Sequence, residues 1–126
     1  MANDKQQVTQ QVEALKTFVL EALDDMKAMD VTVMDVRGKT SVTDWIVIAT
    51  GSSTRHVKSI ANNIVTSAKE KNRRVLGIEG ENEGEWVLVD MGDVIVHVMQ
   101  QQVRDFYDLE SLWAVDAIRR KEAGQD

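Results

Sequence analysis

The chain has 126 residues, of which 43% are hydrophobic, a net charge of −6, and neither cysteine nor proline. A chain of this length builds one hydrophobic core, so we expect a single domain over residues 1–126. The lack of cysteine excludes a disulfide framework, a cysteine-ligated zinc site and a thiol nucleophile. Because the sequence has no apolar leader and no apolar run of about 20 residues, we expect a cytoplasmic protein without a membrane span.

Hydrophobic periodicity predicts the first elements in chain order. Apolar residues at three- and four-residue steps predict an amphipathic helix over residues 4–29. Residues 31–36 and 44–50 are typical of strands, and the second is apolar enough for the centre of a sheet. The linker 37–43 is too short for a crossover, so we expect these two strands to be antiparallel.

The second half of the sequence predicts a helix, three strands and a terminal helix. Gly51-Ser52-Ser53-Thr54 ends a strand and caps a helix, and the β-α-β connection to residues 75–79 predicts a parallel pairing. Residues 86–89 and 94–99 read as a hairpin, and residues 101–121 as a helix before a frayed end. The sum is an α/β domain with a mixed five-stranded sheet packed by helices.

The negative charge is concentrated in one stretch. Residues 75–103 contain no lysine or arginine but six acids: Glu79, Glu81, Glu83, Glu85, Asp90 and Asp93. Such a stretch repels a phosphate backbone, because proteins bind nucleic acids largely through Lys and Arg. It attracts a basic protein surface and accelerates the encounter with it. The alternative is that these acids only keep the protein in solution.

Strand alternation divides the hairpin residues between two faces. One face is purely apolar and suits a core: Val87, Val89, Val94, Val96 and Val98. The other is mixed and is the candidate interface: Trp86, Leu88 and Asp90, opposite Ile95, His97 and Met99. Tryptophan is the residue type most often found as an energetic anchor of interfaces. The alternative is that Trp86 packs under the last helix.

A catalytic nucleotidyltransferase needs a Gly-Ser turn for phosphates and two acids, one residue apart, for Mg²⁺ on the next strand. Gly51-Ser52 and Arg55 supply the first half, but the next strand carries only Glu79. We expect His56 to be a surface residue and His97 a hydrogen-bonded sheet residue. The sequence therefore predicts no catalytic residue, metal or cofactor. The remaining alternative is a non-catalytic nucleotide-binding module.

Several stretches, taken in order, resemble the Iojap-related ribosomal silencing factors. They are VMDVRGK (33–39), SVTD (41–44), TGSSTRHV (50–57), EG (79–80), WVLVD (86–90), GDVIVHVM (92–99), Arg104, YDLE (107–110) and LW (112–113). The match covers about residues 10–115 without gaps, and the tail beyond Ala114 lies outside it.

The resemblance implies a nucleotidyltransferase-like fold without catalytic residues. It also implies binding to ribosomal protein fourteen on the joining face of the large subunit. There the protein would hinder the small subunit sterically and lower translation when nutrients are short. For this contact we expect Trp86 as anchor, with Leu88 and Met99 around it, Asp90 and Glu110 facing basic side chains, and Tyr107 within reach.

Three further expectations concern the tail and other partners. Leu109, Leu112 and Trp113 are expected to pin the tail to the sheet. A basic group can touch ribosomal RNA or simply be solvated: Arg55, Lys58, Lys69, Lys71, Arg73 and Arg74. The resemblance also makes a homodimer plausible, and leaves a role in assembling the large subunit as an alternative to blocking it.

Overall fold

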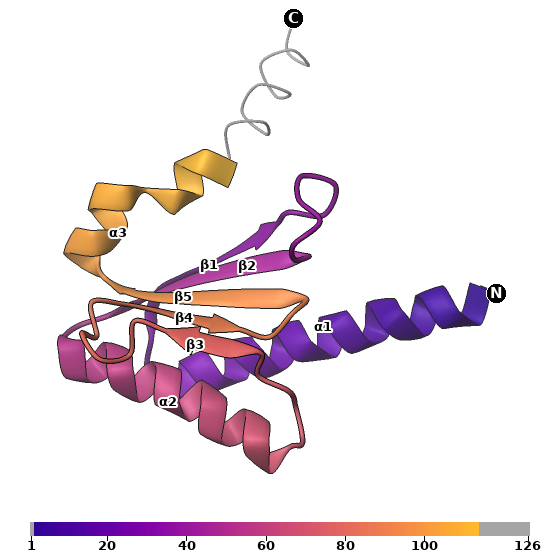
Figure 1. Cartoon of the computed structure of the whole chain (residues 1–126), viewed down its shortest axis with the longest axis horizontal. Coiled ribbons are helices and arrows are strands. Elements are labelled where there is room, and N and C mark those ends of the chain that lie inside the picture. Colours follow the sequence, from indigo (N-terminus) through magenta and orange to yellow (C-terminus); the bar gives the residue numbers. More distant parts are fainter. Residues whose placement is uncertain (1, 114–126) are drawn as a thin grey trace, which may run out of the picture.

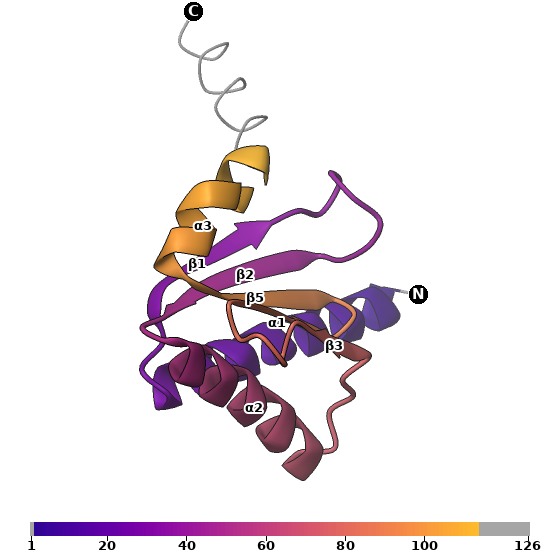
Figure 2. The ribbon, with the colours of Figure 1, turned by 60° about the vertical axis from the view of Figure 1, so that its left-hand side comes forward.

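The computed structural model describes residues 2–113, with side chains from residue 6 onward. Its elements are α1 (Ala2–Asp25), β1 (Met29–Asp35), β2 (Trp45–Gly51), α2 (Thr54–Glu70), β3 (Gly77–Glu79), β4 (Trp86–Asp90), β5 (Val94–Gln100) and α3 (Gln101–Tyr107). The strands form one mixed five-stranded sheet in the order β1-β2-β5-β4-β3. Helices α1 and α2 lie on one face of it and α3 on the other (Figures 1 and 2). The predicted α/β fold is confirmed.

The antiparallel pairing of β1 with β2 and the β4–β5 hairpin are confirmed, whereas the predicted place of β3 is wrong. Strand β3 pairs only with β4, antiparallel, at the edge of the sheet. The parallel neighbour of β2 is β5, which pairs with it through seven residues, whereas β3 has three residues in all. The longer, more apolar strand therefore occupies the centre of the sheet.

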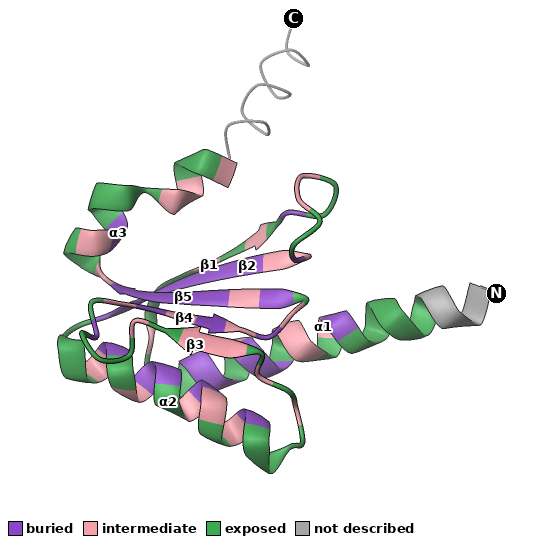
Figure 3. Cartoon of the chain, viewed as in Figure 1, coloured by how far each residue is buried: buried purple, intermediate pink, exposed green. Residues whose placement is uncertain are grey.

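The main core lies between the sheet and the helices α1 and α2. The five valines assigned to the core face of β4 and β5 are all fully buried there. Helix α1 adds Phe18, Val19 and Leu23. Its N-terminal half runs past the sheet (Figure 3), and Val8 is 58% exposed, so the start of the predicted amphipathic helix lies outside the core. The helix also ends at Asp25 rather than residue 29, because Met29 begins β1.

A smaller apolar cluster lies under α3 on the opposite face. Val36, Ile46, Ile48 and Met99 are buried there, and Val103, Leu109 and Trp113 pack on them. Leu109 and Trp113 thus hold the tail on the sheet as predicted, whereas Leu112 is 67% exposed and does not.

The predicted helix 101–121 is interrupted at Asp108, which adopts a left-handed conformation with φ of 48°. Helical turns resume at residues 109–113, and the rest of that prediction, with the predicted frayed end, lies outside the described residues. Within residues 2–113, no helix has both the length and the apolar character needed to cross a membrane.

Candidate functional site

The candidate site lies on the sheet face opposite α1 and α2, in the part that α3 leaves uncovered. Trp86 pairs with Met99, Leu88 with His97, and Asp90 with Ile95, so these residues share the face away from α1 and α2. Glu79 joins them because β3 places it beside Leu88. We call this surface the open sheet face; its half-buried or exposed members are Glu79, Trp86, Leu88, Asp90 and Ile95.

Trp86 is held by three neighbours on this face. Its indole Nε1–H donates a hydrogen bond of 2.9 Å to Nδ1 of His97. Its ring centroid lies 4.8 Å from that of Tyr107, with the two rings tilted by 51°. Met99 lies beside it in the sheet and is fully buried. Trp86 therefore packs partly against α3 but stays half-exposed, and His97 is the hydrogen-bonded sheet histidine that the sequence predicted.

Tyr107 extends the aromatic surface onto α3. It is 55% exposed, and its ring lies 5.0 Å from the ring of Phe106, which is 80% exposed. An aromatic side chain left in solvent beside other aromatics is typical of interaction surfaces. The exposure of Phe106 could not be predicted from the sequence, because an apolar residue in a predicted helix is expected to pack.

The other residues assigned to the binding surface differ in how much they offer a partner. Met99 has no exposed surface, so it supports Trp86 and cannot touch a partner directly. One carboxylate oxygen of Asp90 accepts a 2.9 Å hydrogen bond from the backbone N–H of Gly92. That bond closes the β4–β5 hairpin and leaves the second oxygen available. Leu88 is half-buried on the open sheet face, between Glu79 of β3 and His97 of β5.

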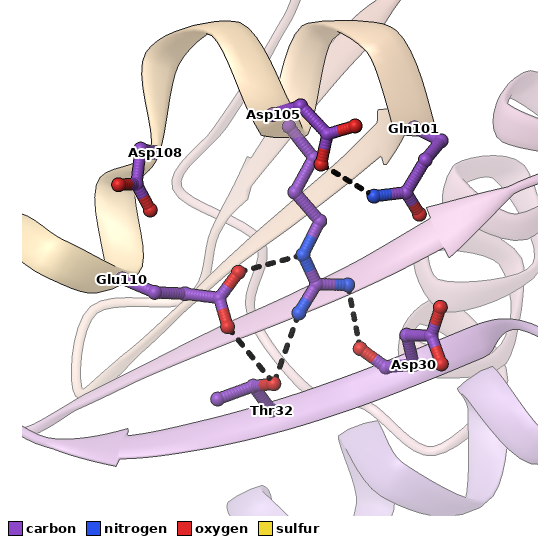
Figure 4. Close-up of a pocket in the computed structure, with 7 residues that line it drawn as sticks. Asp30, Thr32, Gln101, Asp105, Asp108 and Glu110 are labelled. Carbon is purple, nitrogen blue, oxygen red and sulfur yellow. Dashed lines mark hydrogen bonds and ion pairs between the residues drawn. The ribbon is translucent and has the colours of Figure 1, made fainter.

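Glu110, which the sequence assigns to a basic partner, is hydrogen-bonded within the chain. It accepts a 2.7 Å hydrogen bond from Nε of Arg104, whose side chain is only 8% exposed. The remaining guanidinium nitrogens of Arg104 donate to the backbone oxygen of Asp30 and to Thr32 (Figure 4), and also to the hydroxyl of Thr50. We call this network the Arg104 clamp. It ties α3 to β1 and β2, and the guanidinium lowers the pKa of the Glu110 carboxyl.

A hollow of about 540 Å³ opens beside the Arg104 clamp. Three more acids line it, Asp30, Asp105 and Asp108, and Figure 4 shows them around the guanidinium. Asp105 accepts from Gln101, and Asp108 accepts from Ser111. The rim of the hollow is therefore acidic, but it lies over β1, at the other edge of the sheet from β3 and β4.

The polar groups of the Gly51-Ser52 turn form hydrogen bonds within the chain. The backbone N–H of Ser52 donates to Nδ1 of His56 at 2.9 Å, and the N–H of His56 donates to the Ser53 hydroxyl at 3.0 Å. Nε2 of His56 lies 2.8 Å from the backbone oxygen of Met26. His56 is thus half-buried and joins α2 to the end of α1, so its prediction as a surface residue is wrong. A phosphate at this turn would compete with these bonds.

Burial lowers the pKa of His97 from 6.5 to about 4, which gives a testable pH dependence. The folded protein favours the neutral ring, so the unfolded chain takes up the proton first as the pH falls. The resulting stabilisation is complete above pH 6.5 and is lost as the pH falls to about 4, by up to about 3 kcal/mol. Urea unfolding at stepped pH measures this loss.

The variant His97→Leu provides the control, because it cannot titrate and should lack this part of the slope. The pairing of Glu110 with Arg104 affects stability at lower pH, below the ordinary carboxyl pKa of 4.5, because the folded protein lowers the pKa of Glu110. The two contributions therefore separate on the pH axis. Equal slopes for both proteins between pH 6.5 and 4.5 would show that folding does not lower the pKa of His97.

Several known proteins are similar to this chain in sequence or in structure. A Haemophilus influenzae protein named ribosomal silencing factor RsfS is 46% identical over 80% of this chain and 99% of its own length. A crystal structure of a Chromobacterium violaceum protein superposes with a TM-score of 0.80, at 44% identity, over 82% of this chain and 86% of that one. An Arabidopsis thaliana protein named Iojap-related, mitochondrial, is 33% identical over 86% of this chain and 61% of its own length.

The sequence model described as ribosomal silencing factor during starvation matches residues 9–126. That match extends past residue 113, where the quoted motifs end, and covers all strands of the sheet and the open sheet face. The relatives and the sequence model agree with the resemblance that the motifs indicated. The chain belongs to the family of ribosomal silencing factors.

Proposed function

We propose that the protein represses translation by binding the large ribosomal subunit through ribosomal protein fourteen and blocking its association with the small subunit. Family membership supports a ribosomal role. The observation that carries the mode of action is the open sheet face, an uncovered apolar surface centred on a half-exposed tryptophan and bordered by acids. A surface with an aromatic centre and a charged rim has the composition of a protein-binding site.

The charges around the open sheet face favour a basic protein as partner. On this face Glu79 is exposed and Asp90 is half-buried; Glu83, Glu85 and Asp93 are exposed in the adjoining loops, whereas Glu81 lines a hollow with Lys58 and Val65 of α2. Lysine or arginine side chains on ribosomal protein fourteen would be attracted to this rim, which raises the rate of encounter more than the affinity. Asp90 contributes its free oxygen, whereas Glu110 acts indirectly, by holding α3 and Tyr107 in place through the Arg104 clamp.

The same geometry favours a binding protein over an enzyme. Strand β3 carries Glu79 as its one acid, and the described residues contain no group of three or more His, Asp or Glu side chains that could hold a metal ion. The Gly51-Ser52 turn donates its Ser52 N–H to the protein's own His56. The phosphate-binding half of a nucleotidyltransferase site, the Gly51-Ser52 turn, is thus hydrogen-bonded within the chain. The metal-binding half lacks its second acid on β3.

Ribosomal RNA and a second copy of the chain remain additional partners in this proposal. Two of the basic residues on the far side already face the ring of Phe18: Lys71 at 5.6 Å and Arg73 at 5.2 Å. The others, Arg55, Lys58, Lys69 and Arg74, are exposed. For a homodimer, β1 offers an edge without a strand neighbour, on which Val31 and Val33 are exposed.

The proposal is tested with isolated ribosomal subunits. The purified protein should co-sediment with large subunits, cross-link to ribosomal protein fourteen, and reduce the formation of complete ribosomes when small subunits are added. Binding without any effect on joining would leave the partner intact but contradict the blocking mechanism, and would favour a role in subunit assembly. A steep loss of binding with salt would indicate that ribosomal RNA contributes.

A further inference from the structure

The hydrogen bond between Trp86 and His97 determines what Trp86 can offer a partner. An indole has a single polar hydrogen, its Nε1–H, and no acceptor. That hydrogen is bound to Nδ1 of His97 at 2.9 Å, and His97 itself is only 9% exposed. The exposed part of the Trp86 side chain therefore consists of carbon and its hydrogens alone.

We infer that His97 is a positioning residue for ribosome binding: it fixes the indole of Trp86 in one orientation and makes the anchor wholly apolar. This inference rests on the proposed function and specifies the partner's chemistry at that point. Opposite Trp86 the partner presents hydrocarbon, such as the methylene stem of a lysine or arginine, and not a hydrogen-bond acceptor. The basic head group of that side chain then reaches Glu79, which lies beside Leu88 on the neighbouring strand.

The position of His97 in the sheet suits this role. It lies in the central strand β5, between Leu88 of β4 and Ile48 of β2, and both neighbours restrict movement of its ring. To accept from the indole, Nδ1 must be unprotonated, so the proton of the neutral ring resides on Nε2. The acceptor is thus both rigid and held in the correct tautomer.

Tyr107 restricts the same indole from the other side. Its ring centroid lies 4.8 Å from that of Trp86, while the ring of His97 lies 5.8 Å away. A tryptophan fixed in this way loses little rotational freedom when a partner binds, because the freedom was already lost on folding. Ordering one such side chain in advance corresponds to roughly a threefold to tenfold gain in affinity.

The test combines two His97 variants with a control substitution that lowers stability without changing the Trp86–His97 contact. His97→Leu keeps the volume and removes the acceptor, whereas His97→Asn places an amide oxygen near the position of Nδ1. Val87→Ala lowers stability from the opposite face of the sheet without touching the indole. Indole N–H signals in nitrogen-15 NMR spectra report on Trp45, Trp86 and Trp113 separately, and co-sedimentation reports on binding to large subunits.

We expect His97→Leu to shift the Trp86 indole signal and speed its hydrogen exchange, and to weaken binding roughly threefold to tenfold. His97→Asn should restore both properties, and Val87→Ala should change neither. Normal binding by His97→Leu, with the indole signal shifted and Trp86→Ala still deficient, would overturn the positioning role alone. Normal binding by Trp86→Ala would overturn the proposed interface itself, so the two failures are distinguishable.

Discussion

Replacement of Arg104 by alanine is expected to lower the free energy of unfolding by roughly 3 kcal/mol, the cost of removing a buried, fully bonded charge. The substitution deletes four hydrogen bonds, to Glu110, the backbone oxygen of Asp30, Thr50 and Thr32. Thr50 is 2% exposed, so water cannot easily replace the lost partner. Urea unfolding followed by circular dichroism measures the change.

Two variants test whether the fork geometry of Arg104 matters. Arg104→Lys keeps the charge but cannot donate in several directions from one plane, so it should lose most of the stability that alanine loses. Gln101→Ala changes an exposed residue on the same helix and should stay within about 0.5 kcal/mol of the parent. A loss below 1 kcal/mol for Arg104→Ala would mean that α3 is held by the packing of Leu109 and Trp113 instead.

Replacement of Trp86 by alanine is expected to abolish co-sedimentation with large subunits while the fold is retained. Truncation of a central tryptophan anchor typically costs ~2 kcal/mol or more, which is roughly a thirtyfold loss of affinity. The main core lies on the opposite face of the sheet, so the strands keep their packing against α1 and α2. Sedimentation through sucrose measures binding, and far-ultraviolet circular dichroism measures the fold.

Trp45→Ala is the matched control for this experiment. Trp45 is also half-buried, but it pairs with Val94 and packs on the side of α1, where Nζ of Lys16 lies 3.8 Å from its ring centroid. The control removes an equal indole far from the open sheet face and should bind as the parent does. Undiminished co-sedimentation of folded Trp86→Ala would remove Trp86 from the interface.

The sequence predicts best what depends on neighbouring residues. The two faces of the β4–β5 hairpin followed from alternation alone, because successive side chains of a strand point to opposite sides. The position of β3 in the sheet did not follow from the sequence, because strand order depends on which strand pairs most favourably with β2. A connection through a helix fixes the direction of β3 but not its neighbour.

The Arg104 clamp was not predictable for a related reason. Its partners Thr50, Thr32 and Asp30 are 54, 72 and 74 residues away in the sequence. Without the fold, Glu110 looks like any exposed acid near the end of a helix, which is why it was assigned to a partner. The Trp86–His97 bond spans only 11 residues, and strand register brings it within reach of prediction, but the rotamers that form it come from the fold.

The parallel pairing of β2 with β5 has a consequence for how the chain is made. Residues 45–51 find their central neighbour only in residues 94–100, so the middle of the sheet joins the two halves of the sequence. A nascent chain that ends before β5 exposes the apolar faces of β2 and α2, and contacts of such long separation form late. The sheet can therefore be completed only after the ribosome has translated through residue 100, so a chain that stops before β5 cannot form the centre of the fold.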